Sequence, residues 1–257
     1  MIDIFLIPLI LAMLLVVIHA WFGQGILQRG IIFTDLAIAQ FAALGSAVSL
    51  GYFHQEYMYL LTFSFALGAA LFIALASFRT VNLEAFIGLI YVLGASGILM
   101  VLAHSAEGME HFKSLLANDI LFTTSKQLIE ASLLYGGIGL VLWKIYPKTK
   151  GFIRELLFFS LLALTVTSSV QLAGVLVVFI LLIAPVLVAS MQSRFPSFLF
   201  AVGFGWSVCV IALAVAFYAD LPTGYTIVSI GAFTAIGSVL ALSKKREIRG
   251  PDSGSHF

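Results

Sequence analysis

Long apolar runs separated by short polar breaks form the main pattern along this chain of 257 residues. Most runs are about 20 residues long, the length that an α-helix needs to cross the hydrocarbon core of a bilayer, and they lack the alternation of membrane β-strands. Charged residues, glycines, prolines or polar clusters bound each run. The pattern predicts nine transmembrane helices, at 4–22, 31–53, 57–78, 83–104, 126–146, 153–171, 173–191, 197–218 and 222–243.

One boundary depends on a weak polar signal. The apolar run from Phe152 to Val188 is too long for one span, and its only polar interruption is TVTSSVQLAG. A tight hairpin is therefore expected between Ser168 and Gly174. Residues 1–243 then form one transmembrane domain, and the basic residues 244–257 are expected to be a disordered cytoplasmic tail.

Composition supports an all-α polytopic membrane protein. Hydrophobic residues make up 61% of the chain and charged residues 10%, with a mean hydropathy of +1.12. The single cysteine, Cys209, excludes an intrachain disulfide. The sequence has no G-x-x-x-x-G-K-[ST] phosphate-binding loop, so any ATP hydrolysis would need a partner subunit. We expect no nucleic-acid partner.

The basic residues predict the orientation, because they concentrate on the cytoplasmic side. With the N-terminus outside and the C-terminus inside, only Lys113 and Lys126 of the 13 Lys and Arg residues lie outside. The others are predicted to be cytoplasmic: Arg29, Arg79, Lys144, Lys148, Lys150, Arg154, Arg194, Lys244, Lys245, Arg246 and Arg249.

Two carboxyl groups fall within the predicted spans, where ionisable residues are costly and normally face the bundle interior or a water-filled path. Asp35 lies in the cytoplasmic third of the second span, and its alternatives are a helix N-cap, a partner for Arg29, or a residue of a substrate path. Glu84 begins the fourth span, where a first-turn interaction with the helix dipole competes with a path role.

The outer segment 104–126 contains His104, Glu107 and His111, which would share one helical face. Both residue types bind divalent metals, so this face is a candidate metal-contacting surface. The competing interpretation is an interfacial amphipathic helix with ordinary solvated side chains. His19 stands alone near the end of the first span and is expected to pack or cap there. No catalytic constellation is evident, so an enzyme is not expected.

Two connections have features of contact sites. LIAPVLVASMQSRFPSF, residues 182–198, combines a proline within an apolar run with a short basic turn on the predicted cytoplasmic side, which could dock a soluble subunit. Pro185 alone is equally explained by the tolerance of membrane helices for proline. ADLPTGYTIV, residues 219–228, is predicted to be an outer turn.

Five stretches occur in the order and at about the spacing seen in one known family: RGIIFTDLAIAQFAALG, NLEAFIGLIYVLGASGILM, HFKSLLANDILFTTSKQL, LAGVLVVFILLIAPVLVAS and YADLPTGYTIV. With them, the chain resembles the permease subunits of ABC importers for zinc, manganese and iron. The resemblance covers nearly the whole chain. It implies a type II-like ABC importer permease in the bacterial plasma (inner) membrane.

The resemblance also implies partners and sites. The permease would pair with a second copy, a cytoplasmic ABC ATPase dimer and an extracytoplasmic solute-binding protein, and it would hold no permanent cofactor, because the divalent metal ion is its transported substrate. The segment from Pro185 through Gln192, Ser193 and Arg194 to Pro196 is similar to the coupling helix that contacts the ATPase. The turn with Asp220, Pro222 and Gly224 is similar to part of the outer face.

Asp35 matches the aspartate of the second span that is similar in position to a residue lining the metal path. Many family members carry a histidine four residues later, in a D-A-L-S-H stretch, whereas this chain has Ala39. The nearest polar residue is Gln40, which lies about 140° around the helix from Asp35 and is therefore a weak candidate.

The sequence thus predicts a permease that forms the translocation path for a divalent metal ion, with Asp35 contributing charge. A permease for a metal chelate is the first alternative, because a site without the histidine is a poorer zinc site. An ion-coupled secondary transporter is the second, although the two halves show no convincing internal repeat. A purely structural membrane scaffold is the third, and the two carboxyl groups disfavour it.

Overall fold

The computed structural model describes residues 2–79, 82–103, 119–192 and 195–249. Within these ranges it contains nine α-helices and two 3-10 helices. Their bounds are α1 (Ile2–Arg29), α2 (Thr34–Tyr52), α3 (Met58–Ala76), α4 (Leu83–Leu102), η1 (Ile120–Phe122), α6 (Ser125–Lys144), η2 (Tyr146–Lys148), α7 (Gly151–Ala173), α8 (Val175–Ser190), α9 (Ser197–Ala219) and α10 (Thr223–Arg249).

The prediction of an all-α membrane protein with about nine spans is confirmed. Eight helices in the described part of the chain are long and apolar enough to cross a membrane. The ninth, α8, is an apolar helix of 16 residues and is about 24 Å long at 1.5 Å per residue. Each helix satisfies its own backbone hydrogen bonds, which lipid cannot do.

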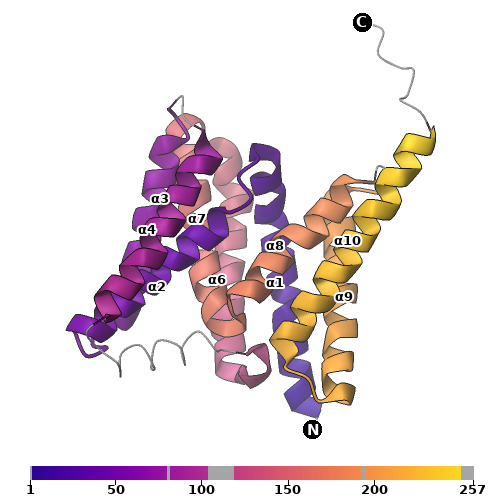
Figure 1. Cartoon of the computed structure of the whole chain (residues 1–257), viewed down its shortest axis with the longest axis horizontal. Coiled ribbons are helices and arrows are strands. Elements are labelled where there is room, and N and C mark those ends of the chain that lie inside the picture. Colours follow the sequence, from indigo (N-terminus) through magenta and orange to yellow (C-terminus); the bar gives the residue numbers. More distant parts are fainter. Residues whose placement is uncertain (1, 80–81, 104–118, 193–194, 250–257) are drawn as a thin grey trace, which may run out of the picture.

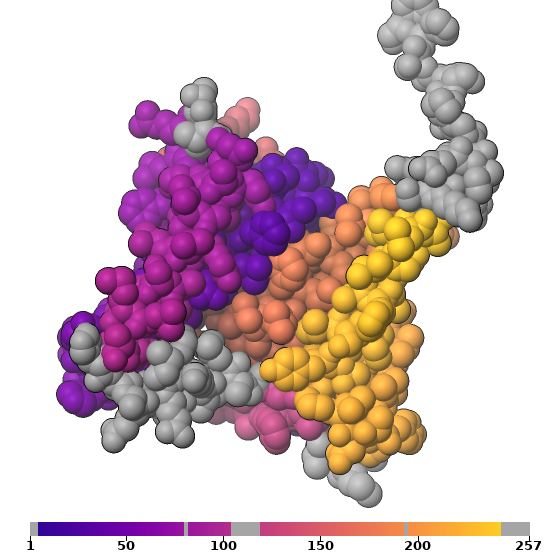
Figure 2. Space-filling view, in the orientation of Figure 1, coloured from indigo at the N-terminus to yellow at the C-terminus, as the bar shows by residue number. Residues whose placement is uncertain are grey.

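The helices form two groups joined through the middle of the bundle (Figure 1). The first group contains α2, α3 and α4, and α7 packs against α3 and α2. The second contains α8, α9 and α10, which pack on one another, with α1 against α8 and α9. Figure 2 shows the two groups meeting on one face, where α2 also contacts α8.

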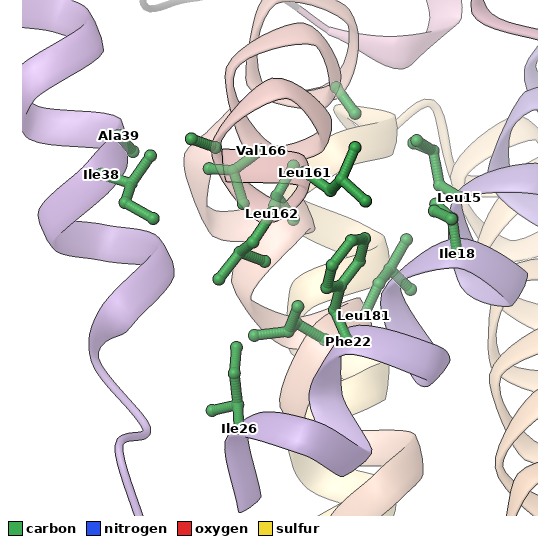
Figure 3. Packing of buried hydrophobic residues seen from close by; sticks show 14 of the residues in the cluster. Leu15, Ile18, Phe22, Ile26, Ile38, Ala39, Leu161, Leu162, Val166 and Leu181 are labelled. Carbon is green, nitrogen blue, oxygen red and sulfur yellow. The ribbon is translucent and has the colours of Figure 1, made fainter. Parts of the chain in front are cut away.

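The largest core cluster lies where α1, α2, α7 and α8 converge. Figure 3 shows Phe22 of α1 between Leu161 and Leu162 of α7 and Leu181 of α8. Phe22 and Leu162 are fully buried. Packing in lipid relies on close van der Waals contact rather than on exclusion of water, so this interlocking holds the two groups together.

The break between α7 and α8 corrects the expected hairpin. Ser168 and Ser169 remain helical, and their hydroxyl groups are satisfied by donating hydrogen bonds to carbonyl oxygens one turn earlier in α7. The chain turns instead at the single residue Gly174, whose φ of +85° is unfavourable for residues with a side chain. The division into two helices is confirmed, and the turn is shorter than expected.

The successive helices alternate in direction, so the N- and C-termini lie at opposite ends of the bundle (Figure 1). We call the end that carries the α1–α2, α6–α7 and α8–α9 connections the basic end. The assignment of the basic end to the cytoplasm stays a prediction. Helix α10 continues to Arg249, six residues beyond the predicted domain boundary at 243, and the rest of the predicted tail lies outside the described residues.

Candidate functional site

The α1–α2 turn positions the first candidate residue. Helix α1 ends at Arg29, and Gly30 follows with a φ of +66°. The hydroxyl group of Thr34 donates a hydrogen bond to the carbonyl oxygen of Ile31 and stabilises the turn. Phe33 is the N-cap residue of α2 and provides no side-chain cap. Asp35 therefore lies in the first turn of α2 and is not its N-cap, which corrects one of the sequence alternatives.

Asp35 is buried without a complete set of partners. The residue is 1% exposed, and its Oδ1 atom accepts no hydrogen bond within the described structure. The second alternative, an ion pair with Arg29, is also wrong, because Arg29 pairs with Glu155. Burying a polar atom without a hydrogen bond costs about 1–3 kcal/mol, so packing alone does not explain this carboxyl group.

Glu84 approaches the same turn from α4. Asn82 caps α4 by accepting a hydrogen bond from the backbone N–H of Ala85, which leaves Glu84 free to reach outward. The backbone N–H of Phe33 donates a 3.4 Å hydrogen bond to Oε1 of Glu84, whereas its buried Oε2 has no partner. Glu84 therefore contacts the backbone of Phe33, which lies two residues before Asp35 in the sequence. Helix α2 packs against α4.

The two neighbours of Asp35 in the family motif point in different directions. Figure 3 shows Ala39 and Ile38 on the side of α2 that faces Val166 of α7. Asp35 shares this side with Ala39, because they are four residues apart. Gln40 instead packs on α4, where a Cβ atom on Gly94 would lie 3.0 Å from the Gln40 Cβ atom. Gln40 therefore leaves the side that carries Asp35.

The outer metal-contacting residues lie beyond what the structure covers. His104, Glu107 and His111 fall outside the described residues, so that interpretation stays a prediction. In the described ranges, no group of three or more His, Cys, Asp and Glu side chains is arranged to hold a metal ion. Asp35 and Glu84 thus both lie near the α1–α2 turn, and they do not form a complete metal centre within the described residues.

The predicted coupling segment divides into a buried and an exposed part. Pro185 lies inside α8, where it is buried and faces Gly205 of α9, so it is not available to a partner. Gln192 forms two 3.0 Å hydrogen bonds with the backbone of Phe195, one as donor and one as acceptor, and so ties the turn together. Pro196 is the N-cap of α9. Ser193 and Arg194 lie outside the described residues.

The exposed part of this turn contains a residue that sequence reasoning missed. Phe195 is 62% exposed and stacks on Phe200 of α9, with ring centroids 6.4 Å apart. An aromatic side chain held this way at the basic end is a suitable anchor for a protein partner. Its position between a basic residue and a proline was the available signal.

The outer turn is confirmed as a turn between α9 and α10. Asp220 ends α9 in the left-handed conformation, with a φ of +51°, and Pro222 precedes α10. The backbone N–H of Gly224 donates a 3.4 Å hydrogen bond to Asp119, which also accepts one from Leu121 in η1. Asp119, which we had not singled out, therefore ties the outer turn to the segment before α6.

Arg29 and His19, in contrast to Asp35, have partners inside the bundle. Arg29 donates two hydrogen bonds to Glu155, of 3.1 and 2.9 Å, and its guanidinium lies 4.2 Å from the ring centroid of Phe158. His19 is fully buried, with its ring nitrogens 2.8 Å from the Leu15 carbonyl oxygen and 3.2 Å from the Ser169 hydroxyl oxygen. The prediction that His19 packs in the bundle is confirmed.

Comparisons with known proteins agree with this architecture. Residues 152–241, which contain nearly all of α7 and most of α10, match the model of the ABC 3 transport family. PsaBC from Streptococcus pneumoniae, solved in complex with Fab, is similar with a TM-score of 0.72 and 18% identity over 90% of this chain and 89% of that one.

A second solved structure has a similar fold. A protein described as a metal-chelate type ABC transporter, in an inward-facing conformation, has a TM-score of 0.66 and 17% identity over 91% of this chain and 85% of that one. A comparison with curated proteins gives no match. The chain therefore has the multi-pass helical fold of these two transporter structures, and its residues 152–241 match the ABC 3 transport family.

Proposed function

We propose that this permease imports a divalent metal ion, either zinc, manganese or iron, across the bacterial plasma membrane. Two copies would form the path, an ATPase dimer would bind at the basic end, and a solute-binding protein would deliver the ion at the opposite end. The five sequence stretches shared with the metal importer family and the match to the ABC 3 transport family support this proposal.

The observation that carries the proposal is the carboxyl group of Asp35. It is almost completely buried and has an oxygen atom without a partner, and Glu84, which has a buried oxygen atom without a partner, contacts the same turn through Phe33. Ionisable groups of this kind in membrane proteins mark ion paths. Carboxylate oxygens are ligands for hard and borderline divalent cations, and a two-fold axis would present each carboxyl group twice.

A metal chelate is the second candidate, and the packing of α2 on α7 favours it. Ala39 is 5% exposed on the side facing Val166, so a histidine there would overpack the contact. The path thus lacks the imidazole that a tight zinc site would use. The neighbour with a TM-score of 0.66 is described as a metal-chelate type transporter.

Coupling to ATP hydrolysis would act through the α8–α9 connection. In this proposal, Phe195 and the adjacent turn bind a groove of the ATPase, and closure of the ATPase dimer moves α8 and α9 as a rigid body. Because α8 also contacts the start of α2 through stacked rings of Phe179 and Phe33, the movement reaches the turn that carries Asp35.

The proposal is tested by ATPase activity of the complete complex in lipid, together with its binding protein. Zinc, manganese, ferrous iron and an iron chelate are titrated separately. We expect one free ion to stimulate hydrolysis and the variant Asp35→Ala to lose both stimulation and uptake of that ion. Glu130→Ala is the matched control, because Glu130 is a 62% exposed carboxylate on α6 that pairs with Lys126, at 3.8 Å.

Each outcome separates the candidates. Stimulation by the chelate alone would favour the second candidate over free-ion transport. Normal uptake by Asp35→Ala would rule out a path role for this residue. Loss of uptake in both variants would show that removing any carboxylate is damaging, and the assignment of Asp35 would then fail.

A further inference from the structure

A polar cavity of about 620 Å³ lies at the basic end, separate from Asp35 and Glu84. It is formed by the last turns of α1, the chain directly after α3, Tyr146 of η2 and the first turns of α7. Neither Asp35 nor Glu84 lines it. A cavity of this size can hold a small polar group together with several waters.

The charges that line the cavity leave one cation without an acidic partner. Both carboxylate oxygens of Glu155 accept hydrogen bonds from Arg29, so these two charges neutralise each other. Arg154 lies 4.9 Å from the ring centroid of Tyr146 and forms no ion pair with any residue that the structure describes. The cavity therefore presents an exposed guanidinium that lies over the Tyr146 ring, and the net charge of its lining is positive.

The backbone and a side-chain amide add to this preference for anions. Helix α7 starts at Gly151, and the N-cap residue Lys150 gives no side-chain hydrogen bond to the free N–H groups of the first turn. A helix of 23 residues places partial positive charge at this end. Gln24 also lines the cavity, and its amide group can supply another donor.

The rim of the cavity is apolar and aromatic. Phe78 lines the cavity and contacts Phe152, with ring centroids 5.6 Å apart, and the next residue along α7, Ile153, is 64% exposed. Trp21 and Tyr146, which pack edge to face at 5.3 Å, form an inner wall. Aromatic side chains near span ends mark the depth of lipid headgroups, and exposed apolar residues there contact acyl chains.

From this arrangement we propose that the cavity binds the phosphate headgroup of an anionic membrane lipid, with Arg154 as its principal ligand. Guanidinium groups bind phosphate through paired hydrogen bonds, and basic pockets between membrane helices are suited to such headgroups. The apolar rim favours a lipid over free phosphate, because it would hold the acyl chains. This site does not depend on what the permease transports.

The test is lipid retention by the purified permease, measured by native mass spectrometry. The probes are phosphatidylglycerol, phosphatidylcholine with the same acyl chains, and inorganic phosphate. We expect one site selective for phosphatidylglycerol, whose affinity falls roughly fivefold or more in Arg154→Gln. Lys144→Gln is the matched control, since Lys144 also lies over an aromatic ring, 5.7 Å from the Trp143 centroid, but does not line the cavity.

The outcomes are distinct. An unchanged affinity in Lys144→Gln, within about twofold, combined with the loss in Arg154→Gln supports the site. Equal losses of affinity in both variants would mean that surface charge in general, and not this cavity, attracts the lipid. No loss of affinity in either variant would overturn the proposal. Competition by inorganic phosphate at the affinity of the lipid would assign the cavity to a soluble anion instead.

Discussion

Arg29 and Asp35 lie six residues apart in the sequence, and the fold treats their charges in opposite ways. Arg29 has a bidentate partner in Glu155, a carbonyl oxygen on Gly25 at 3.0 Å and an aromatic ring beneath it. Asp35 is more deeply buried and has an oxygen without any hydrogen bond. Arg29 therefore contributes to the stability of the bundle, whereas the burial of Asp35 lowers that stability.

This contrast leads to opposite effects on stability and transport. Removing one member of a paired, partly buried ion pair leaves an uncompensated charge and destabilises the protein. Removing a buried carboxyl group that has one unpartnered oxygen eliminates a desolvation cost and loses only local contributions from the first turn of its helix. Stability therefore tests the interpretation of each residue independently of uptake.

The largest effect is expected at the ion pair. Glu155→Gln should lower the free energy of unfolding by about 2 kcal/mol, because the Arg29 guanidinium, 24% exposed, then lacks a countercharge. The midpoint of thermal unfolding in detergent should fall by about 4–8 °C. The double variant Arg29→Gln, Glu155→Gln should be less damaged than the sum of the single variants, since the two residues form one interaction. Strict additivity would contradict a structural pair.

Much of this architecture could be predicted from the sequence, because in lipid the length of an apolar run almost determines a span. The nine helices follow from that rule, and Gly174 was within the predicted break. Asp35 could be identified as unusual for the same reason, since a carboxyl group within a span is costly whatever the fold.

The partners of the charged residues could not be predicted. Arg29 reaches Glu155 over 126 positions, and Asp119 reaches Gly224 over 105. Such contacts depend on the rotation and packing of helices, which local spacing does not specify. The alternative that paired Arg29 with Asp35 failed because Gly30, with a φ of +66°, ends α1 between them. The two residues therefore belong to different helices.

A smaller effect is expected at Asp35. Asp35→Ala should change the free energy of unfolding by no more than about 1 kcal/mol, because relief of the unpartnered oxygen offsets the lost first-turn interaction. The unfolding midpoint should stay within about 4 °C of the original value. The same variant should lose uptake, so a folded and inactive permease is the expected combination. A fall as large as that of Glu155→Gln would mean that Asp35 is structural.

The smallest effect is expected at Glu84, which has features of both residues. Its Oε1 accepts a hydrogen bond from Phe33, as a structural group would, whereas its Oε2 is buried without a partner. Glu84→Gln keeps an acceptor for Phe33 and removes the charge near the start of α4, so stability should fall by only about 0.5 kcal/mol. Uptake measured at limiting substrate distinguishes the two roles. A second path carboxylate would lower uptake severalfold in this variant with little change in the unfolding midpoint, and an unchanged uptake would leave Asp35 as the charge on which the path depends.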